Sequence, residues 1–283
     1  MPVIKVYHHG LTAGVPPQMN NHNRVKREAV HGWSYRSIRS NTRFLYSVEE
    51  SGLTGHGLAL TLTVRDCPPT HADWQNLRDR FFRRLRHLSR KGHTLLRLHW
   101  VNEWQRRGVP HFHMALWFDA PPHPADLLSM WCDLAEPYGA VLRGQHSAPI
   151  SDAVGWFQYV SKHAARGISH YQRSPENVPS QWHGKTGRMW GYLGNWPRRD
   201  AIHFDLSDAA FYAFRRWVRS YRRADARKSR NGRRIAQARR MLSCPDPKLS
   251  AVRGVSEWIE LDDQVRMLVG LAALGYEVEQ RQE

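Results

Sequence analysis

Two histidines and one glutamate are the residues of this chain whose spacing best suits a metal ion. His111 and His113 stand two apart in the run Pro-His-Phe-His-Met at 110–114. On a β-strand, residues two apart point to the same face with Cα atoms about 7 Å apart, so both imidazoles can reach one ion. The competing interpretation is a half-buried strand whose histidines are only solvated or hydrogen-bonded. The pair therefore needs support from neighbouring residues.

Glu103 supplies that support if the segment before the histidines folds as a hairpin. The run Arg-Arg-Gly-Val-Pro at 106–110 predicts the turn, and pairing Glu103 with His111 places the carboxylate on the histidine face. Two nitrogen ligands and one oxygen ligand leave coordination positions open, whereas structural zinc sites are usually closed by four protein ligands. The sequence therefore predicts a catalytic metal site at His111, His113 and Glu103, with Glu103 the ligand that depends most on strand register.

A tyrosine on a basic helix face is the candidate nucleophile. Ser151 or Asp152 begins a predicted helix that ends near Gly167. At about 100° per residue, one side of this helix is apolar and the other is polar and basic. The polar side holds Tyr159, Lys162, His163 and Arg166. A phenol has a pKa near 10 and is a poor nucleophile unless an ammonium or metal ion assists it. Alone this is an ordinary amphipathic surface; beside a metal site it makes Tyr159 and Lys162 catalytic candidates.

The excess of basic residues indicates a polyanionic partner. The 283-residue chain has 42 lysines and arginines against 25 acidic residues, a net charge of +17 and a pI near 10.4. Nucleic acid is the first expectation and an anionic membrane surface the alternative. A mean hydropathy of −0.63 and the lack of a long apolar run argue against a spanning helix. No apolar signal core is seen near residue 1, so we expect a cytoplasmic protein.

Cysteine usage and one glycine-rich segment exclude further classes of site. The three cysteines form no Cys-x-x-Cys pair, which argues against a disulfide framework and a zinc finger. Gly184-Lys185-Thr186 is not a phosphate-binding loop, because Pro179 stands where that motif requires a glycine. We therefore expect no ATPase or helicase activity in this chain.

Hydrophobic periodicity predicts the elements that must position these residues. A strand is expected at 58–64, a helix begins near Thr70 and Asp73, and the hairpin spans 98–118. Another helix is expected at 127–134. A short strand at 44–48 and a loop at 139–149 complete the predicted elements.

Three regions are predicted along the chain. Residues 1–41 show weak periodicity and scattered bases, which predict a basic, partly disordered arm. Residues 42–205 hold the candidate site and predict one domain. Residues 206–283 predict a basic helical region, because arginines are densest there.

Three motifs, in this order, resemble those of the HUH endonucleases. The closest group is the rolling-circle replication initiators of plasmids and of filamentous or related single-stranded DNA phages. Leu-Thr-Leu-Thr at 60–63 resembles their hydrophobic-Thr-Leu-Thr strand, and His-Phe-His at 111–113 resembles their His-hydrophobic-His motif. Tyr-Val-Ser-Lys at 159–162 resembles their Tyr-x-x-Lys motif. A less specific likeness continues at 187–191, so the resemblance covers roughly residues 44–196.

The resemblance implies both a fold and a reaction. The fold would be α+β, with a central antiparallel sheet of about five strands flanked by helices and a basic helical C-terminal extension. Mg²⁺ or Mn²⁺ would be held by His111, His113 and Glu103, and Tyr159, assisted by Lys162, would attack a DNA phosphate. The product would be a 5′-phosphotyrosine link and a free 3′-OH. Expected DNA contacts are Thr61, Thr63, Arg106, Arg107, His163, Arg166, Lys185, Arg188 and Trp190.

The implied partners follow from the same resemblance. They are single-stranded DNA at a replication origin, a host helicase and a host polymerase, with no membrane. Some family members carry two tyrosines in the motif, but the positions four before and four after Tyr159 are Gly155 and His163. A second cleavage is therefore expected to need a second subunit or another nucleophile, such as Tyr171.

Two alternatives stay open. The first is a relaxase or transposase of the same superfamily, with the same chemistry. The second is a non-enzymatic basic nucleic-acid-binding protein whose histidines are structural.

Overall fold

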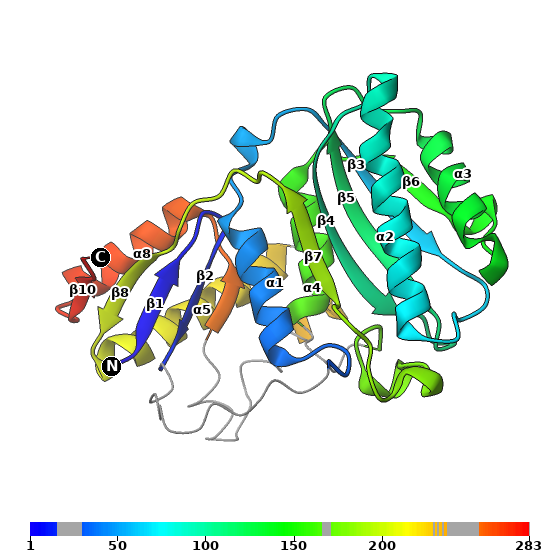
Figure 1. The fold of residues 1–283 in the computed structure, drawn as a ribbon. Helices are drawn as coiled ribbons and strands as arrows, with labels where there is room; N and C mark the ends of the chain where they lie inside the picture. Colours follow the sequence, from blue (N-terminus) through cyan, green and yellow to red (C-terminus); the bar gives the residue numbers. More distant parts are fainter. Residues whose placement is uncertain are drawn as a thin grey trace. The chain divides into compact units, whose positions relative to one another are not determined.

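The chain forms two compact units, each with its own antiparallel sheet (Figure 1). The computed structural model describes residues 1–15, 30–165, 171–228, 230, 232–233, 235–236 and 255–282, without the side chains of residues 35, 162–165 and 255. One unit spans Val25–Arg198, and the other joins Met1–Arg24 to Arg199–Glu283. Both units combine a five-stranded sheet with helices, so the predicted α+β class is confirmed.

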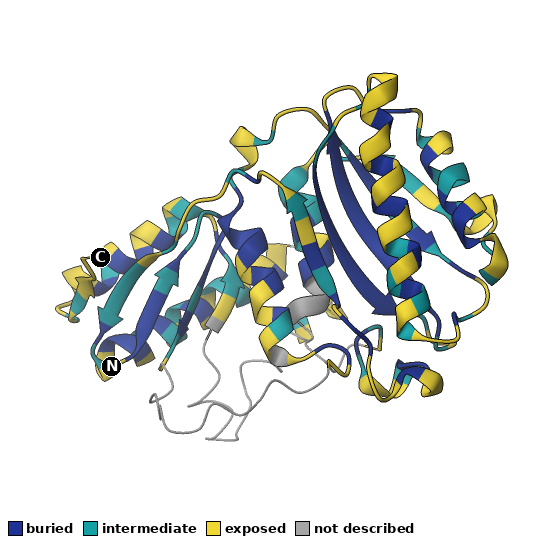
Figure 2. Cartoon of the chain, in the orientation of Figure 1, coloured by how far each residue is buried: buried dark blue, intermediate teal, exposed yellow. Residues whose placement is uncertain are grey.

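The sheet of the Val25–Arg198 unit has the strand order β6-β3-β5-β4-β7. Its strands are β6 (His146–Pro149), β3 (His56–Thr63), β5 (Pro110–Phe118), β4 (Leu95–Trp104) and β7 (Trp190–Gly194), and neighbours pair antiparallel. The central strand β5 is buried along its whole length (Figure 2). A strand buried on both faces must be covered by other elements on both sides.

Two pairs of helices provide this cover. Helices α2 (His71–His87) and α3 (Pro124–Ala135) lie on the face to which Phe112 points, because its ring stacks on Trp74 at 4.4 Å and meets Trp131 at 6.1 Å. Helices α1 (Tyr35–Ser47) and α4 (Ala153–Ala165) lie on the opposite face. There Phe44 of α1 stacks on His99 of β4 with ring centroids 5.5 Å apart. The histidine face is thus the one covered by α1 and α4.

The start of α2 follows the predicted signal. The Thr70 side chain accepts a hydrogen bond from the backbone of Asp73, and the Asp73 side chain accepts one from the backbone of Thr70. This reciprocal capping box satisfies amides that a helix end leaves without partners. The apolar side chains of α2 at helical spacing, Trp74, Leu77, Phe81 and Leu85, are buried.

Two local predictions are wrong. The segment expected as a strand at 44–48 is the end of helix α1, which begins with a capping box between Ser34 and Ser37. Its short apolar run packs as one face of that helix, and only Val48 is extended, in a bridge to Arg198. The segment expected as a loop at 139–149 ends in the edge strand β6, which pairs with β3.

The second unit is built from both ends of the chain. Its strand order is β10-β8-β1-β2-β9: Val278–Gln280, Ile202–Leu206, Val3–Val6, Gly10–Gly14 and Val255–Trp258. Helices α5 (Asp208–Lys228) and α8 (Leu261–Ala273) contact each other and the sheet. The core includes Ile4, Leu11, Leu206, Phe214 and Leu271.

This unit corrects the predicted arm at 1–41. Strand β1 lies between β2 and β8, with Lys5 opposite both Thr12 and His203. Strand β2 follows β1 directly, but β8 is about 200 residues away in the sequence, and the local pattern of short strands and glycines gave no sign of that pairing. The described boundaries therefore differ from the predicted divisions at residues 41 and 205. No helix of the described residues is long and apolar enough to cross a membrane.

Candidate metal and nucleophile site

Glu103, His111 and His113 meet on one face of the central sheet. One ligand atom from each lies within 4.8 Å of the others, and all three residues are buried. His111 Nε2 is 3.1 Å from His113 Nε2, and His113 Nε2 is 3.6 Å from Glu103 Oε2. Two nitrogens bound at about 2.1 Å to one ion, at right angles, would stand about 3 Å apart. The spacing of the two imidazoles therefore fits a shared ion.

The hairpin register produces this cluster. Glu103 of β4 pairs with His111 of β5, as predicted, and Val101 pairs with His113. Paired residues share a face of the sheet, so the carboxylate joins the two imidazoles. The turn includes Gly108, whose φ of +71° lies in the left-handed region that glycine adopts without strain. Phe112, between the histidines, is buried in the opposite layer.

Thr61 orients one of the imidazoles. It pairs with His113 across β3 and β5, and its Oγ1 lies 3.1 Å from His113 Nδ1. A hydrogen bond at Nδ1 leaves Nε2 directed at the cluster, which is how metal-binding histidines are commonly fixed. The structure therefore gives Thr61, a predicted DNA contact, a partner inside the site.

Burial keeps His113 neutral. Burial is the main cause that lowers the pKa of His113 from 6.5 to about 3, with smaller contributions from His111 and Arg173. A neutral imidazole is the form that binds a metal ion, so no proton has to be displaced from this residue near neutral pH.

Arg173 holds the carboxylate of Glu103 and was missed by the sequence analysis. Both its Nε and its Nη2 lie 2.8 Å from Glu103 Oε1, and neither side chain is exposed to solvent. Burial raises the pKa of Glu103 and lowers the pKa of Arg173, and the ion pair opposes both shifts. The guanidinium also lies 4.1 Å from the centroid of the Trp33 ring and donates to the carbonyl of Val160. Arg173 contacts Oε1 of Glu103, and Oε2 is the oxygen of that carboxylate that faces His113.

The residues around Arg173 pack across the ends of β4 and β5. Gln172 Nε2 lies 3.4 Å from His111 Nε2, and the backbone carbonyl of Gln172 accepts a hydrogen bond of 2.8 Å from the amide of Trp104. The run Tyr-Gln-Arg at 171–173 carries no periodicity or motif. Its role in the site is therefore visible only in the structure.

Tyr159 lies beside the Glu103–His111–His113 cluster. Asp152 caps α4 by accepting the Gly155 amide hydrogen at 2.8 Å, and the helix then carries Tyr159 to the histidine face. The Tyr159 and His113 rings meet edge to face with centroids 5.8 Å apart, while 41% of Tyr159 remains exposed. Burial raises the pKa of Tyr159, and the nearby Glu103 and Tyr171 raise it further. Positive charge is therefore needed beside the phenol to make it a nucleophile.

The predicted residues of α4 and of the segment around the start of β7 fall into three groups. The side chains of Lys162 and His163, and Arg166 as a whole, lie outside the described residues. Lys185 and Arg188 are exposed in the segment before β7. Trp190 packs against Phe44 and Tyr192, with ring centroids 5.9 and 6.3 Å away.

The residues of the β4–β5 turn and of the end of β3 have protein partners. Arg107 donates to the carbonyls of Val64 and Arg65, and Thr63 Oγ1 accepts a hydrogen bond of 2.7 Å from Gln105. Arg106 is exposed and lies over the Tyr171 ring at 5.0 Å. Arg106 and Arg107 are therefore both exposed at this turn, with Arg107 held by the carbonyls to which it donates.

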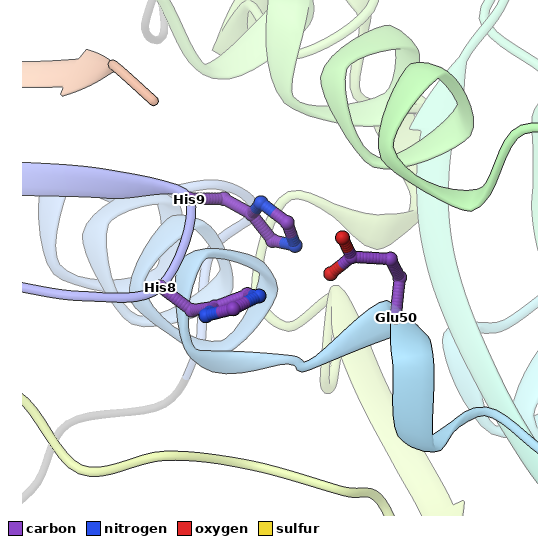
Figure 3. Close-up of side chains that lie close together, drawn as sticks. All are labelled: His8, His9 and Glu50. Carbon is purple, nitrogen blue, oxygen red and sulfur yellow. The ribbon is translucent and has the colours of Figure 1, made fainter. Parts of the chain in front are cut away.

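A second group of histidines lies in the other unit. His8 and His9, at the turn between β1 and β2, meet edge to face with ring centroids 4.4 Å apart (Figure 3). Glu50, drawn with them, belongs to the Val25–Arg198 unit. No metal site is therefore assigned to these three residues.

Known proteins similar to this chain are described as replication proteins. The sequence profile of the family "Replication-associated protein ORF2/G2P" matches residues 57–168. The chain is 50% identical to a putative replication protein of Xylella fastidiosa strain 9a5c, over 98% of this chain and 99% of that protein. It is 49% identical to the replication-associated protein G2P of Pseudomonas phage Pf3, again over 98% of this chain and 99% of that protein. No solved structure matches. The chain therefore belongs to the ORF2/G2P family of replication-associated proteins, a family of the rolling-circle initiator type that its three motifs resemble.

Proposed function

We propose that this protein is an HUH-type, sequence-specific endonuclease and ligase of single-stranded DNA that starts rolling-circle replication. The observation that carries the proposal is the position of Tyr159, whose ring lies against His113 of the Glu103–His111–His113 cluster. A nucleophile beside a metal site is the arrangement that a phosphoryl transfer through a covalent intermediate requires.

We assign the metal ligands to His111, His113 and Glu103. One carboxylate oxygen and two imidazole nitrogens accept Mn²⁺ well, and Mg²⁺ prefers oxygen more strongly, so Mn²⁺ is the better ion for a first assay. A divalent ion bound there would polarise the scissile phosphate and offset charge near the phenol.

Each remaining residue has a role that follows from its position. Tyr159 Oη forms a bond to phosphorus as the bond from phosphorus to the 3′-oxygen breaks. The phenolic proton is lost and the 3′-oxygen gains one, which leaves a 5′-phosphotyrosine link and a free 3′-OH. Lys162 is assigned to offset negative charge on the phenolate, and Arg173 holds Glu103 in place. The link conserves the phosphodiester bond, so the reverse reaction rejoins the strand.

The partners in this proposal are single-stranded origin DNA and the replication machinery of the host cytoplasm. A host polymerase would extend the free 3′-OH and a host helicase would open the duplex. A second subunit, or Tyr171, would perform the second cleavage. The alternative of a relaxase or transposase has the same chemistry. The names of the two relatives refer to replication, which favours an initiator of replication.

The proposal is tested by metal-dependent nicking. We expect the protein to cleave origin single strands in Mn²⁺, and expect EDTA, His111→Ala or His113→Ala to lower the rate at least about a hundredfold, because charge stabilisation in phosphoryl transfer is lost. His87→Ala, an exposed position on α2, is the matched control. If both site variants cleave like the unchanged protein, the non-enzymatic alternative with structural histidines gains and the metal role is wrong.

A further inference from the structure

A cavity of about 260 Å³ opens beside Tyr159, and no step of the proposed reaction uses it. Its walls come from β3, from β6 and the segment after it, and from the first turns of α4. Ala59, Thr61, Ala148, Trp156 and Tyr159 are among its lining residues. The cavity thus lies where the sheet edge meets the helix that carries the nucleophile.

Two residues connect this cavity to the metal cluster. Thr61 lines the cavity and lies 3.1 Å from His113 Nδ1, and Tyr159 lines it and packs its ring on His113. A nucleotide whose phosphate reaches Tyr159 therefore has its neighbouring groups within reach of the cavity.

The lining is suited to a neutral group rather than to a phosphate. It contains no lysine or arginine. The amide end of α4, where an anion would otherwise bind, is already occupied by the Asp152 carboxylate, which accepts the Gly155 amide hydrogen at 2.8 Å. A phosphate here would meet a negative charge without a cation to offset it.

The size and the aromatic surface of the cavity suit a nucleobase as the bound group. The volume of about 260 Å³ lies below the roughly 300–1,000 Å³ of pockets that take drug-sized molecules. The Trp156 and Tyr159 rings, 5.5 Å apart and inclined by 34°, offer aromatic surface of the kind on which unpaired bases stack. The Trp156 Nε1 donor is buried and has no hydrogen-bond partner among the described residues. A base brings acceptors on its edge.

Gly155 keeps the helix side of the cavity open. It lines the cavity one turn before Tyr159, and a Cβ at this position would lie 2.2 Å from Asp152 Oδ2. A side chain here would therefore disturb the cap of α4 as well as fill the cavity.

We propose that this cavity takes one unpaired base of the substrate strand, that of a nucleotide next to the scissile phosphate, and selects it by shape and stacking. The inference rests on the proposed nicking reaction for the position of the phosphate. It assigns part of the sequence specificity to Ala148 and Trp156, whereas basic residues hold the backbone without reading sequence.

The test combines cavity variants with strands that lack one base. The full-length protein, with Mn²⁺, is given origin strands carrying a single abasic site at each position around the nick, and both cleavage kcat/KM and strand Kd are measured. Ala148→Leu fills the cavity, and Trp156→Ala removes its aromatic wall. Ala125→Leu, at an exposed position of α3, is the matched control.

At one position next to the nick, we expect the abasic site to weaken binding and kcat/KM about tenfold, the loss of one stacked base. Ala148→Leu and Trp156→Ala should each weaken binding and cleavage of the intact strand to a similar extent. They should change binding and cleavage of the strand that is abasic at that position little, and Ala125→Leu should change neither strand. The proposal is overturned if, in a variant that folds, the loss caused by the substitution and the loss caused by the abasic site multiply at every position tested. The substituted residue and the missing base would then act independently. If no protein cleaves, the nicking reaction fails, and the same comparison of Kd values still decides whether a base fills the cavity.

Discussion

Arg173 is the residue outside the Glu103–His111–His113 cluster whose removal should disturb that cluster most. It pairs with the fully buried Glu103, and its loss would leave a buried carboxylate without its cation. We expect Arg173→Met to lower the free energy of unfolding by about 3–5 kcal/mol, and Arg173→Lys by less, as measured by urea denaturation. The control is Arg65→Met, which breaks an exposed pair with Asp66 and should change stability little. Equal effects of Arg173→Met and Arg65→Met would contradict the assigned role.

His99 should make stability depend on pH. It is fully buried, and burial, followed by repulsion from Arg173, lowers its pKa from 6.5 to about 3. The unfolded chain therefore binds a proton between about pH 6.5 and 3 that the folded chain does not, so stability is full above pH 6.5 and falls as the pH falls.

The size of this effect can be measured by replacing the imidazole. His99→Gln should reduce the pH dependence of the unfolding free energy between pH 6 and 4 by up to about 1.4 kcal/mol per pH unit, the value for one proton. The measurement is urea denaturation in EDTA at several pH values, with the exposed His87→Gln as control. His113 contributes to the remaining slope, because its pKa is also lowered to about 3. An unchanged slope in His99→Gln would show that His99 does not resist protonation.

At the scale of elements, the capping box of α2 is the clearest local device. Thr70→Ala removes the side chain that accepts the Asp73 amide hydrogen and should cost about 1 kcal/mol of unfolding free energy. Thr70→Ser keeps the acceptor and should cost less. Ser51→Ala, at an exposed position before β3, serves as control in the same thermal and urea unfolding measurements. A Thr70→Ala protein as stable as the control variant would be inconsistent with the cap.

The hairpin shows what the sequence predicts well. Alternation fixed which residues share a face, and the turn at 106–110 set Glu103 opposite His111. The start of α2 was equally local, because its capping box spans only four residues. Signals contained within a few residues were thus sufficient to predict the hairpin that brings Glu103, His111 and His113 together, and the start of α2.

Contacts between distant segments were the part that could not be predicted. Arg173 reaches Glu103 across 70 positions, and nothing in its local sequence distinguishes it from other arginines. The run at 44–48 was ambiguous because a short apolar segment suits a helix as well as a strand, although Ser34 and Ser37 offered a usable helix-start signal. The expected DNA-contact residues stay predictions.

At the scale of the whole molecule, the unit built from both chain ends makes a prediction about fragments. Strand β1 lies between β2 and β8, and its Ile4 belongs to a core completed by residues after 199. A fragment of residues 1–198 keeps β1 and β2 but loses the rest of that core, so it should bind a hydrophobic dye and aggregate. A fragment of residues 30–198 keeps the whole central sheet and should remain monodisperse in size-exclusion chromatography and bind Mn²⁺ in calorimetry.

Comparison of the two fragments tests whether β1 and β2 depend on the C-terminal region and whether the Val25–Arg198 unit folds alone. If residues 1–198 are as well folded as residues 30–198, the first strands do not depend on the C-terminal region. If residues 30–198 fail to fold, the Val25–Arg198 unit is not independent.

The central claim is that Tyr159 becomes covalently linked to DNA. The most direct measurement is incubation of the protein and Tyr159→Phe with an origin single strand and Mn²⁺, followed by denaturing electrophoresis and peptide mass spectrometry. We predict a DNA-linked peptide that contains Tyr159 in the unchanged protein, and no adduct in Tyr159→Phe, which should still bind Mn²⁺ and the strand. A covalent adduct formed by Tyr159→Phe, at Tyr171 or elsewhere, would contradict the account.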